Sequence, residues 1–166
     1  MPLPRRSLAL GLACAALAVA GCGDSSEDEA AAPTASATQA ATPEPTKPEV
    51  SVPKGKPPRR LVKKDLRRGD GPGAQPGQLV QVQYVGVSYS NGRQFDASWD
   101  RGEPFAFQLG AGQVIPGWDN GIAGMKVGGR RRLVIPPEQA YGPQGSPPSI
   151  GPNETLVFVV DLLAVQ

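Results

Sequence analysis

Few side chains in this sequence can carry acid–base, nucleophilic or metal chemistry. Histidine is absent, and cysteine occurs only at Cys14 and Cys22. The lack of histidine removes imidazole metal sites, serine–histidine and cysteine–histidine nucleophiles, and histidine acid–base catalysis together. The short loop Gly110-Ala111-Gly112 lacks the spacing of a dinucleotide-binding site. We therefore expect no metal and no cofactor, and chemistry of a kind that needs neither, such as rotation about a bond.

A second group of residues combines aromatic rings with glycines and a few polar side chains. Six such fragments follow one another collinearly over about 100 residues. They are Tyr84–Gly86 with Asn91–Ser98, Phe105–Gly110, Gln113–Gly121, Met125–Gly128, Ala140–Gly142 and Thr155–Phe158. In this order they resemble the FKBP-type immunophilins, which are peptidyl-prolyl cis–trans isomerases.

The resemblance implies a twisted antiparallel sheet wrapped around one short helix, and the rotation of Xaa–Pro peptide bonds. Resonance across the amide makes that rotation slow, taking tens to hundreds of seconds unassisted. The amide is twisted at the transition state and its resonance is lost. A dry aromatic pocket with a few orienting polar groups suits this reaction, because water stabilises the planar, polar amide.

Site residues follow from the resemblance, position by position. Trp118 would form the floor under the proline ring, the backbone N–H of Ile115 would bind a substrate carbonyl, and the Tyr141 hydroxyl would bind another. Asp96 would lie at the pocket edge, oriented by Arg101. The residues expected to be catalytic are Tyr84, Phe95, Asp96, Tyr141 and Phe158. Those expected to bind substrate are Arg101, Phe105, Val114, Ile115, Trp118 and Ile150.

Several of these residues have a plainer interpretation. Phe95 and Phe158 could be core residues, and Asp96 with Arg101 could be a surface ion pair worth under ~1 kcal/mol. Trp99 is expected at the rim, partly exposed, and Arg130–Arg132 as a solvated start of a strand. The residues expected in the core rather than the site are Phe107, Leu109, Leu133, Ile135, Leu156 and Val160.

The loop after Tyr141 departs from the family pattern. The family often carries a histidine and two isoleucines there, whereas this chain has Ser146, Ser149 and Ile150, among several prolines. Substrate preference and efficiency therefore stay open. A second hypothesis is a binding module or chaperone that grips proline-containing segments without turnover, and a third is a scaffold with an idle pocket.

Short apolar runs separated by glycine and proline predict the elements that would position this site. Residues 79–89 alternate as a strand, and Asn91-Gly92 then predicts a tight turn. Further strands are predicted at 105–109, 132–135 and 155–165. The last is apolar on both faces and so is expected to be central. A helix is predicted within 114–125, with Pro116 in its first turn, giving an α+β domain.

The N-terminal part reads as a secretory lipoprotein signal over residues 1–21. Arg5 and Arg6 precede an apolar run that is shorter than a bilayer-spanning helix, and the run ends in Val19-Ala20-Gly21-Cys22. This resembles a bacterial lipobox with Cys22 as the lipidated residue; the alternative is an ordinary signal peptide cut nearby. The protein is then expected to be exported and anchored to the outer face of the cytoplasmic membrane, or facing a periplasm.

Residues 22–58 are expected to form a disordered linker rich in alanine and proline, and residues 59–166 the isomerase domain. Across 47–68, nine Lys and Arg residues oppose two acidic residues, a net charge of +7. That run is expected to be solvated linker, with contact to anionic headgroups as the alternative. The chain's net charge of +2 does not suggest nucleic acid. Expected partners are proline-containing segments, immunophilin-type macrolides and, through the lipid, a membrane; the domain is expected to be a monomer.

Overall fold

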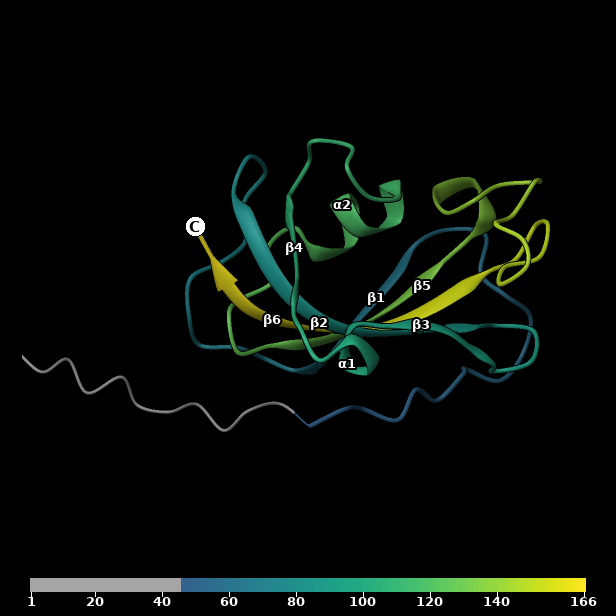
Figure 1. Ribbon diagram of the computed structural model, residues 1–166, viewed down its shortest axis with the longest axis horizontal. Coiled ribbons are helices and arrows are strands. Elements are labelled where there is room, and N and C mark those ends of the chain that lie inside the picture. The colour runs from purple at the N-terminus through teal and green to yellow at the C-terminus, as the bar shows by residue number, and fades with distance from the viewer. Residues whose placement is uncertain (1–45) are drawn as a thin grey trace, which may run out of the picture. The chain divides into compact units, whose positions relative to one another are not determined.

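One antiparallel β-sheet organises residues 46–166, the part of the chain that the computed structural model describes (Figure 1). Its strands are β1 (Val62–Arg67), β2 (Leu79–Ser88), β3 (Gln94–Ala97), β4 (Phe105–Gln108), β5 (Arg130–Ile135) and β6 (Leu156–Val165). They lie in the order β1-β5-β6-β2-β3, and β4 pairs with β2. Two short helices, α1 (Ser98–Arg101) and α2 (Pro116–Ile122), and a 3₁₀ turn (Pro137–Gln139) complete the fold. The predicted α+β class, an antiparallel sheet around a short helix, is confirmed.

Strand β6 is central, as its sequence predicts, lying between β5 and β2. Its residues alternate between the two faces of the sheet. Leu156, Phe158 and Val160 belong to the main core beneath α2, whereas Val157 belongs to a smaller core on the opposite, outer face. Burial on both faces explains why this strand lacks the apolar–polar alternation of a solvent-facing strand.

Helix α2 lies directly on the sheet because glycine lets it approach. A Cβ on Gly121 would stand 2.7 Å from Leu133 Cδ1, and one on Gly117 would collide with Ile135, so any larger residue would push the helix off β5. Pro116 occupies the first helical position, as predicted. The helix covers Pro116–Ile122, fewer residues than the 114–125 window in which it was predicted.

Three elements were not anticipated from the sequence: β1, β3 and α1. Strand β1 is an exposed edge strand in which charged residues interrupt the apolar ones, so its sequence resembles linker. It is held by pairing with β5, from Val62 opposite Val134 onward. Strand β3 and helix α1 have four residues each, too short for a periodic pattern to emerge.

The described end of the expected linker packs against the sheet. Val50 and Val52 cover the outer core formed by Val85, Val87, Ala97, Val134 and Val157. Two arginines of β5 also hold this segment: Arg130 Nη2 donates to the Thr46 carbonyl (2.8 Å), and Arg132 Nη1 to the Ser51 carbonyl (3.4 Å). We call residues 46–52 the N-terminal strap; Figure 1 shows this stretch running beneath the sheet, on the side away from α2. The structured region thus starts well before residue 59, because two valines are enough to dock the strap on an apolar face.

The arginines that begin β5 are not simply solvated, which corrects the expectation for Arg130–Arg132. Arg130 makes a two-point ion pair with Asp161, from Nε to Oδ1 (2.7 Å) and from Nη2 to Oδ2 (2.9 Å). Asp161 is 1% exposed. Arg131 pairs with Asp65 of β1 at 2.5 Å and donates to the Gly121 carbonyl at 2.9 Å. Strand pairing brings these partners together. They lie far apart in the sequence, so the sequence alone does not identify them as partners.

The expected signal segment, Cys22 and the linker up to residue 45 lie outside the described residues. Within residues 46–166, no helix has the length and apolar character that crossing a membrane requires.

Candidate functional site

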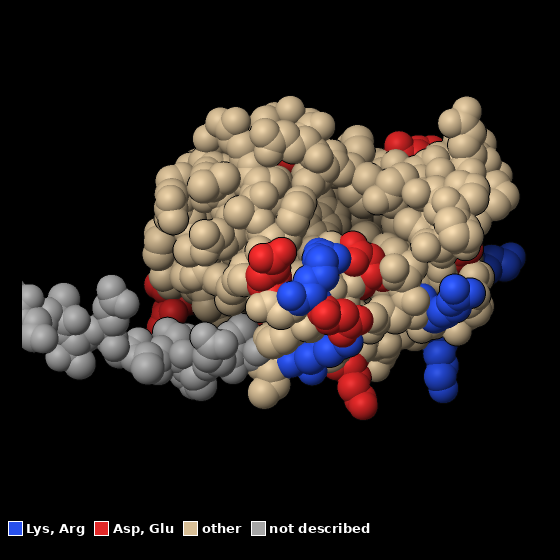
Figure 2. Space-filling view, in the orientation of Figure 1, with Lys and Arg blue, Asp and Glu red and all other residues tan. Residues whose placement is uncertain are grey.

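A pocket of about 300 Å³ opens on the side of the sheet that carries α2. It is lined by ten residues: Tyr84, Phe95, Asp96, Phe105, Gln113, Val114, Ile115, Trp118, Tyr141 and Phe158. They come from β2, β3, β4, β6, α2 and the loops before α2 and after the 3₁₀ turn. In Figure 2 this face has a hollow bordered mostly by uncharged residues, with acidic and basic side chains gathered below it.

Trp118 forms the centre of the aromatic cluster. Its ring lies edge-to-face with Tyr84 (centroids 4.9 Å apart, 85°) and with Phe158 (5.3 Å, 87°), and Phe105 stands 6.1 Å away. Trp118 is only 4% exposed, whereas Phe105 is 36% exposed at the mouth. The geometry is that of a floor with walls, and edge-to-face packing holds the rings in fixed orientations.

Glycine shapes the wall opposite the helix. A Cβ on Gly86 would lie 2.7 Å from both Phe158 Cε1 and Phe95 Cζ. Phe95 and Phe158 pack edge-to-face across this position, with centroids 5.5 Å apart. Phe95 and Phe158 therefore belong to the pocket wall and also pack with the main core, so the alternative interpretation of these two phenylalanines is partly correct.

The polar side of the pocket is a three-residue cluster. The Tyr84 hydroxyl donates to Asp96 Oδ2 (2.5 Å) and accepts from Arg101 Nη2 (2.8 Å). Arg101 Nη1 in turn donates to Asp96 Oδ1 (2.6 Å), and its guanidinium lies 5.6 Å from the centre of the Tyr84 ring. Arg101 thus orients Asp96, as the sequence analysis expects, and it orients Tyr84 as well. It does so from the edge, because it is not one of the lining residues.

Burial controls the ionisation of the pocket phenols. Burial, reinforced by the hydrogen bond to Asp96, raises the pKa of Tyr84 to about 12, against the Arg101 hydrogen bond, which lowers it. Burial, with the charge of Asp96, also raises the pKa of Tyr141. Both phenols therefore stay protonated at neutral pH and can act as hydrogen-bond donors. No group of three or more metal-ligating side chains occurs within residues 46–166.

The raised pKa of Tyr84 gives an expected pH dependence. A group whose pKa is higher in the folded than in the unfolded chain favours folding below its unfolded value, here about 10. That contribution should be lost as pH rises from about 10 through about 12, so the stability difference between wild type and Tyr84→Phe should narrow over this range. Urea unfolding at a series of pH values measures this narrowing, and the tyrosinate absorbance of Tyr84→Phe should lack a phenol that titrates near pH 12 in wild type. A constant difference between the two proteins from pH 8 to 11.5 would contradict the assignment.

Nine of the eleven expected site residues line the pocket; Arg101 lies at its edge, and Ile150 lies elsewhere. Ile150 is 5% exposed and packs in the main core instead of lining the wall. Its backbone pairs with Ser146 through two hydrogen bonds of 2.9 Å, so it closes a small turn. Trp99 is partly exposed, as expected, but it packs against the outer core and is not one of the residues that line the pocket.

Ile115 and Tyr141, the two expected hydrogen-bond donors, both line the pocket. Ile115 directly precedes α2, where backbone N–H groups lie beyond the reach of the helix's own carbonyls. Tyr141 is 42% exposed at the mouth. Gln113 also lines the pocket, although it was not among the expected site residues. Its side-chain oxygen accepts from the Gln108 N–H (2.9 Å) and so shapes the loop before the helix. No local signal distinguishes it from a loop glutamine.

This chain is similar in sequence and in fold to known proteins. Residues 71–163 match the model of the family described as FKBP-type peptidyl-prolyl cis-trans isomerase. The chain is 62% identical over 120 residues to an FK506-binding protein of Streptomyces anulatus, covering 72% of this chain and 97% of the relative. It is 50% identical over 118 residues to a probable FK506-binding protein of Corynebacterium glutamicum, and the match covers 71% of this chain and 98% of that relative. The crystal structure of AtFKBP13 superposes with a TM-score of 0.60 at 40% identity, covering 64% of this chain and 93% of that one. The crystal structure of FkpA from Escherichia coli superposes with a TM-score of 0.58 at 45% sequence identity. The match covers 64% of this chain and 48% of that one.

Proposed function

Because this chain belongs to the FKBP-type peptidyl-prolyl cis–trans isomerase family, we propose that it accelerates the rotation of Xaa–Pro bonds in exported polypeptides and so assists their folding. The observation that carries the proposal is the aromatic pocket floored by Trp118, with the Tyr84–Asp96–Arg101 cluster at one edge. No side chain in it is needed as an acid, a base or a nucleophile.

The proposed mechanism follows from the pocket's polarity. The proline ring lies on Trp118, with Phe105 and Phe158 beside it, and the amide before the ring is drawn out of water. Loss of hydration removes part of the preference for the planar, polar amide, which lowers the barrier to twisting. The Ile115 N–H and the Tyr141 hydroxyl hold neighbouring carbonyls, so one side of the bond is fixed while the other rotates.

A protease-free isomerisation assay on an Xaa–Pro peptide tests this proposal. The full chain, purified in detergent, should give a rate above the uncatalysed one that rises linearly with protein concentration. A macrolide of the immunophilin-ligand class should suppress it and quench Trp118 fluorescence, a proposal supported by the relatives' description as FK506-binding proteins. An uncatalysed rate at every protein concentration, with correctly folded protein, would reject isomerase activity.

The hydroxyl of Tyr141 is expected to contribute one hydrogen bond to catalysis. Tyr141→Phe should lower kcat/KM by roughly threefold to tenfold, equivalent to ~0.5–1.5 kcal/mol, and leave the pH profile flat from about pH 6 to 8. Steady-state kinetics over this range measures both. A loss above a thousandfold, or a bell-shaped profile, would instead indicate general acid–base catalysis.

One structural feature favours the second candidate, a chaperone or binding module without turnover. The loop from Pro143 to Ser149 beside Tyr141 is largely exposed and rich in proline and serine, and the one family-like isoleucine, Ile150, packs in the core. Peptide affinity without rate enhancement would support this candidate. Replacing residues 143–149 with a loop from an active relative should then restore turnover, whereas an isomerase needs no such rescue.

The proposed location is the outer face of a bacterial cytoplasmic membrane, or a periplasm, through lipid on Cys22. The sequence from Arg5 to Cys22 supports it, and two acyl chains already suffice for stable anchoring. Cys22→Ala should release the protein or leave it unprocessed, as measured by membrane fractionation and intact mass, while Cys14→Ala serves as the matched control. A Cys22→Ala protein that is processed normally and stays as tightly bound as wild type would reject the lipoprotein assignment.

A further inference from the structure

Helix α1 is a single turn that cannot be stable by itself. It has four residues, no side-chain cap at Ala97, and one backbone hydrogen bond at its end, from the Gly102 N–H to the Trp99 carbonyl (3.3 Å). The first turn of a helix costs more conformational entropy than its hydrogen bonding returns. The orientation of α1, and of Arg101 at its end, is therefore set by contacts with the rest of the protein.

Each of the four residues of α1 has such a contact. Ser98 is fully buried; its hydroxyl accepts from the Tyr84 N–H (2.8 Å) and donates to Gln83. Trp99 packs on the outer core. Arg101 holds Asp96 and the Tyr84 hydroxyl. Asp100, the remaining residue of α1, contacts the N-terminal strap through Lys47.

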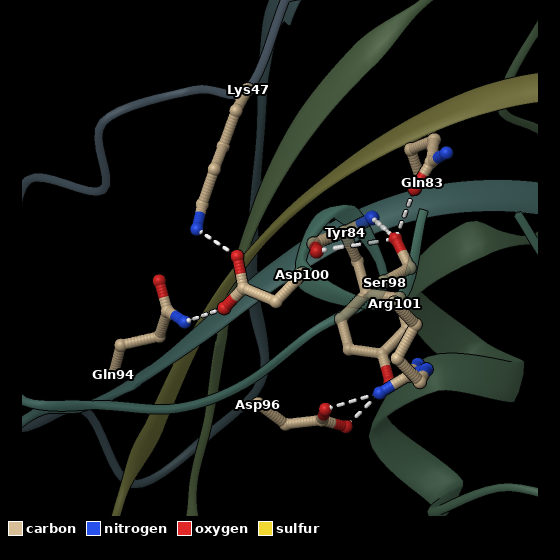
Figure 3. A network of polar contacts seen from close by, with 8 residues as sticks. All are labelled: Lys47, Gln83, Tyr84, Gln94, Asp96, Ser98, Asp100 and Arg101. Carbon is tan, nitrogen blue, oxygen red and sulfur yellow. Dashed lines mark hydrogen bonds and ion pairs between the residues drawn. The ribbon is translucent and has the colours of Figure 1, made fainter. Parts of the chain in front are cut away.

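Asp100 joins α1 to β3, six residues before it, and to the strap, 53 residues before it (Figure 3). One carboxylate oxygen pairs with the Lys47 ammonium of the strap, and the other accepts from Gln94 Nε2 of β3 at 2.6 Å. In Figure 3, Lys47 and Gln94 reach Asp100 from two directions, with Arg101, Asp96 and Tyr84 alongside. The Lys47 and Gln94 hydrogen bonds hold the pKa of the Asp100 carboxyl below its usual value, so it is charged at neutral pH.

We propose that Lys47 is a positioning residue of the pocket: by holding Asp100 it fixes the turn of α1 from which Arg101 orients Asp96 and Tyr84. The effect of Lys47 on catalysis rests on the proposed function, whereas its effect on the position of α1 rests only on the contacts described above. The strap is anchored independently by Val50 and Val52 on the outer core and by Arg130 on the Thr46 carbonyl. Lys47 is therefore presented from a docked segment, which lowers the entropy it loses on pairing with Asp100.

The contribution of this pair should concern position rather than overall stability. The Lys47 side chain is 41% exposed and that of Asp100 52%, and exposed ion pairs contribute little to the free energy of unfolding. Salt screens such pairs, since the Debye length falls to about 3 Å at 1 M ionic strength. The effect on activity should therefore disappear at high salt, which distinguishes it from a packing effect.

The test compares full-chain variants at Lys47 by kinetics. Lys47→Ala should lower kcat/KM for the proline peptide about twofold to fivefold at low salt, with an unchanged thermal midpoint. Lys47→Arg should restore the wild-type value, because arginine can still pair with Asp100. Asp100→Asn should show the same loss, and adding Lys47→Ala to it should cause no further loss, because both remove one interaction. Wild type should fall to the level of Lys47→Ala in 1 M NaCl. Lys54→Ala, at an exposed lysine just beyond the strap, is the matched control.

Nuclear magnetic resonance tests the geometry without any activity. In Lys47→Ala, but not in Lys54→Ala, the Arg101 Nε–H signal and the amide signals of 98–101 should shift or broaden. If these signals match the control, or if Lys47→Ala and Lys54→Ala have equal kcat/KM, Lys47 has no positioning role. A failure of Lys47→Arg to restore activity would also overturn the proposal. If the wild type itself lacks turnover, the proposed function fails, and the spectra alone decide the role of Lys47.

Discussion

Replacing Trp118 with alanine is expected to cause the largest loss of activity of any single substitution in the pocket. The side chain is 4% exposed and meets Tyr84, Phe105, Phe107 and Phe158. Removing it takes away the surface on which the proline ring would be buried, a contribution of ~1.5–3 kcal/mol or roughly 10- to 100-fold in kcat/KM. The cavity should also admit water, which would weaken the desolvation on which the proposed mechanism depends.

The same substitution should lower stability by about 3–5 kcal/mol, so activity must be measured where the variant is folded. Leu162→Ala is the matched control: Leu162 is fully buried in the same core but is not part of the pocket lining. It should lose about 2–5 kcal/mol of stability and keep its kcat/KM per folded molecule. Equal kcat/KM losses in the two variants would show that folding, not the pocket floor, determines the result.

The largest loss of stability that involves a polar group is expected at Asp161. This carboxylate is 1% exposed in the central strand β6 and is held by Arg130 at two points, with Arg67 3.5 Å away. Asp161→Ala leaves Arg130, whose side chain is 18% exposed, without its partner in a largely buried position. The expected cost is about 3–5 kcal/mol, measured by urea denaturation at neutral pH.

Asp65→Ala provides the comparison, because it removes an exposed carboxylate from the neighbouring Arg131, which keeps its hydrogen bond to the Gly121 carbonyl. The Asp65 side chain is 38% exposed, whereas that of Asp161 is 1% exposed, so losing Asp65 should destabilise the fold less than losing Asp161. The double variant Asp161→Leu with Arg130→Met should recover much of the stability, since an apolar pair leaves no buried charge. An Asp161→Ala protein within about 1 kcal/mol of wild type would mean that water reaches Arg130 freely.

Local patterns were sufficient for the main framework, and the family resemblance was sufficient for most of the pocket. Alternation along 79–89 and the apolar run at 155–165 predict β2 and the central β6, because side chains on a strand alternate with a period of two. Pro116 sets the start of α2, since proline suits the first helical turn. The aromatic residues expected at the site, from Tyr84 to Phe158, do line one pocket. Their catalytic roles await the substitutions described above.

Contacts between distant residues could be learned only from the folded chain. Arg130 meets Asp161, 31 positions away, and Thr46, 84 positions away, and the strap docks on valines of three different strands. Ile150 belongs to the core because a small turn with Ser146 directs it there. The sequence pattern around a residue predicts which face of an element that residue occupies. It does not predict which residue of another strand will lie opposite it. Sheet pairing decides the partner. For this reason the longer elements can be predicted from the sequence, whereas the ion pairs, the docked strap and the anchoring of α1 cannot.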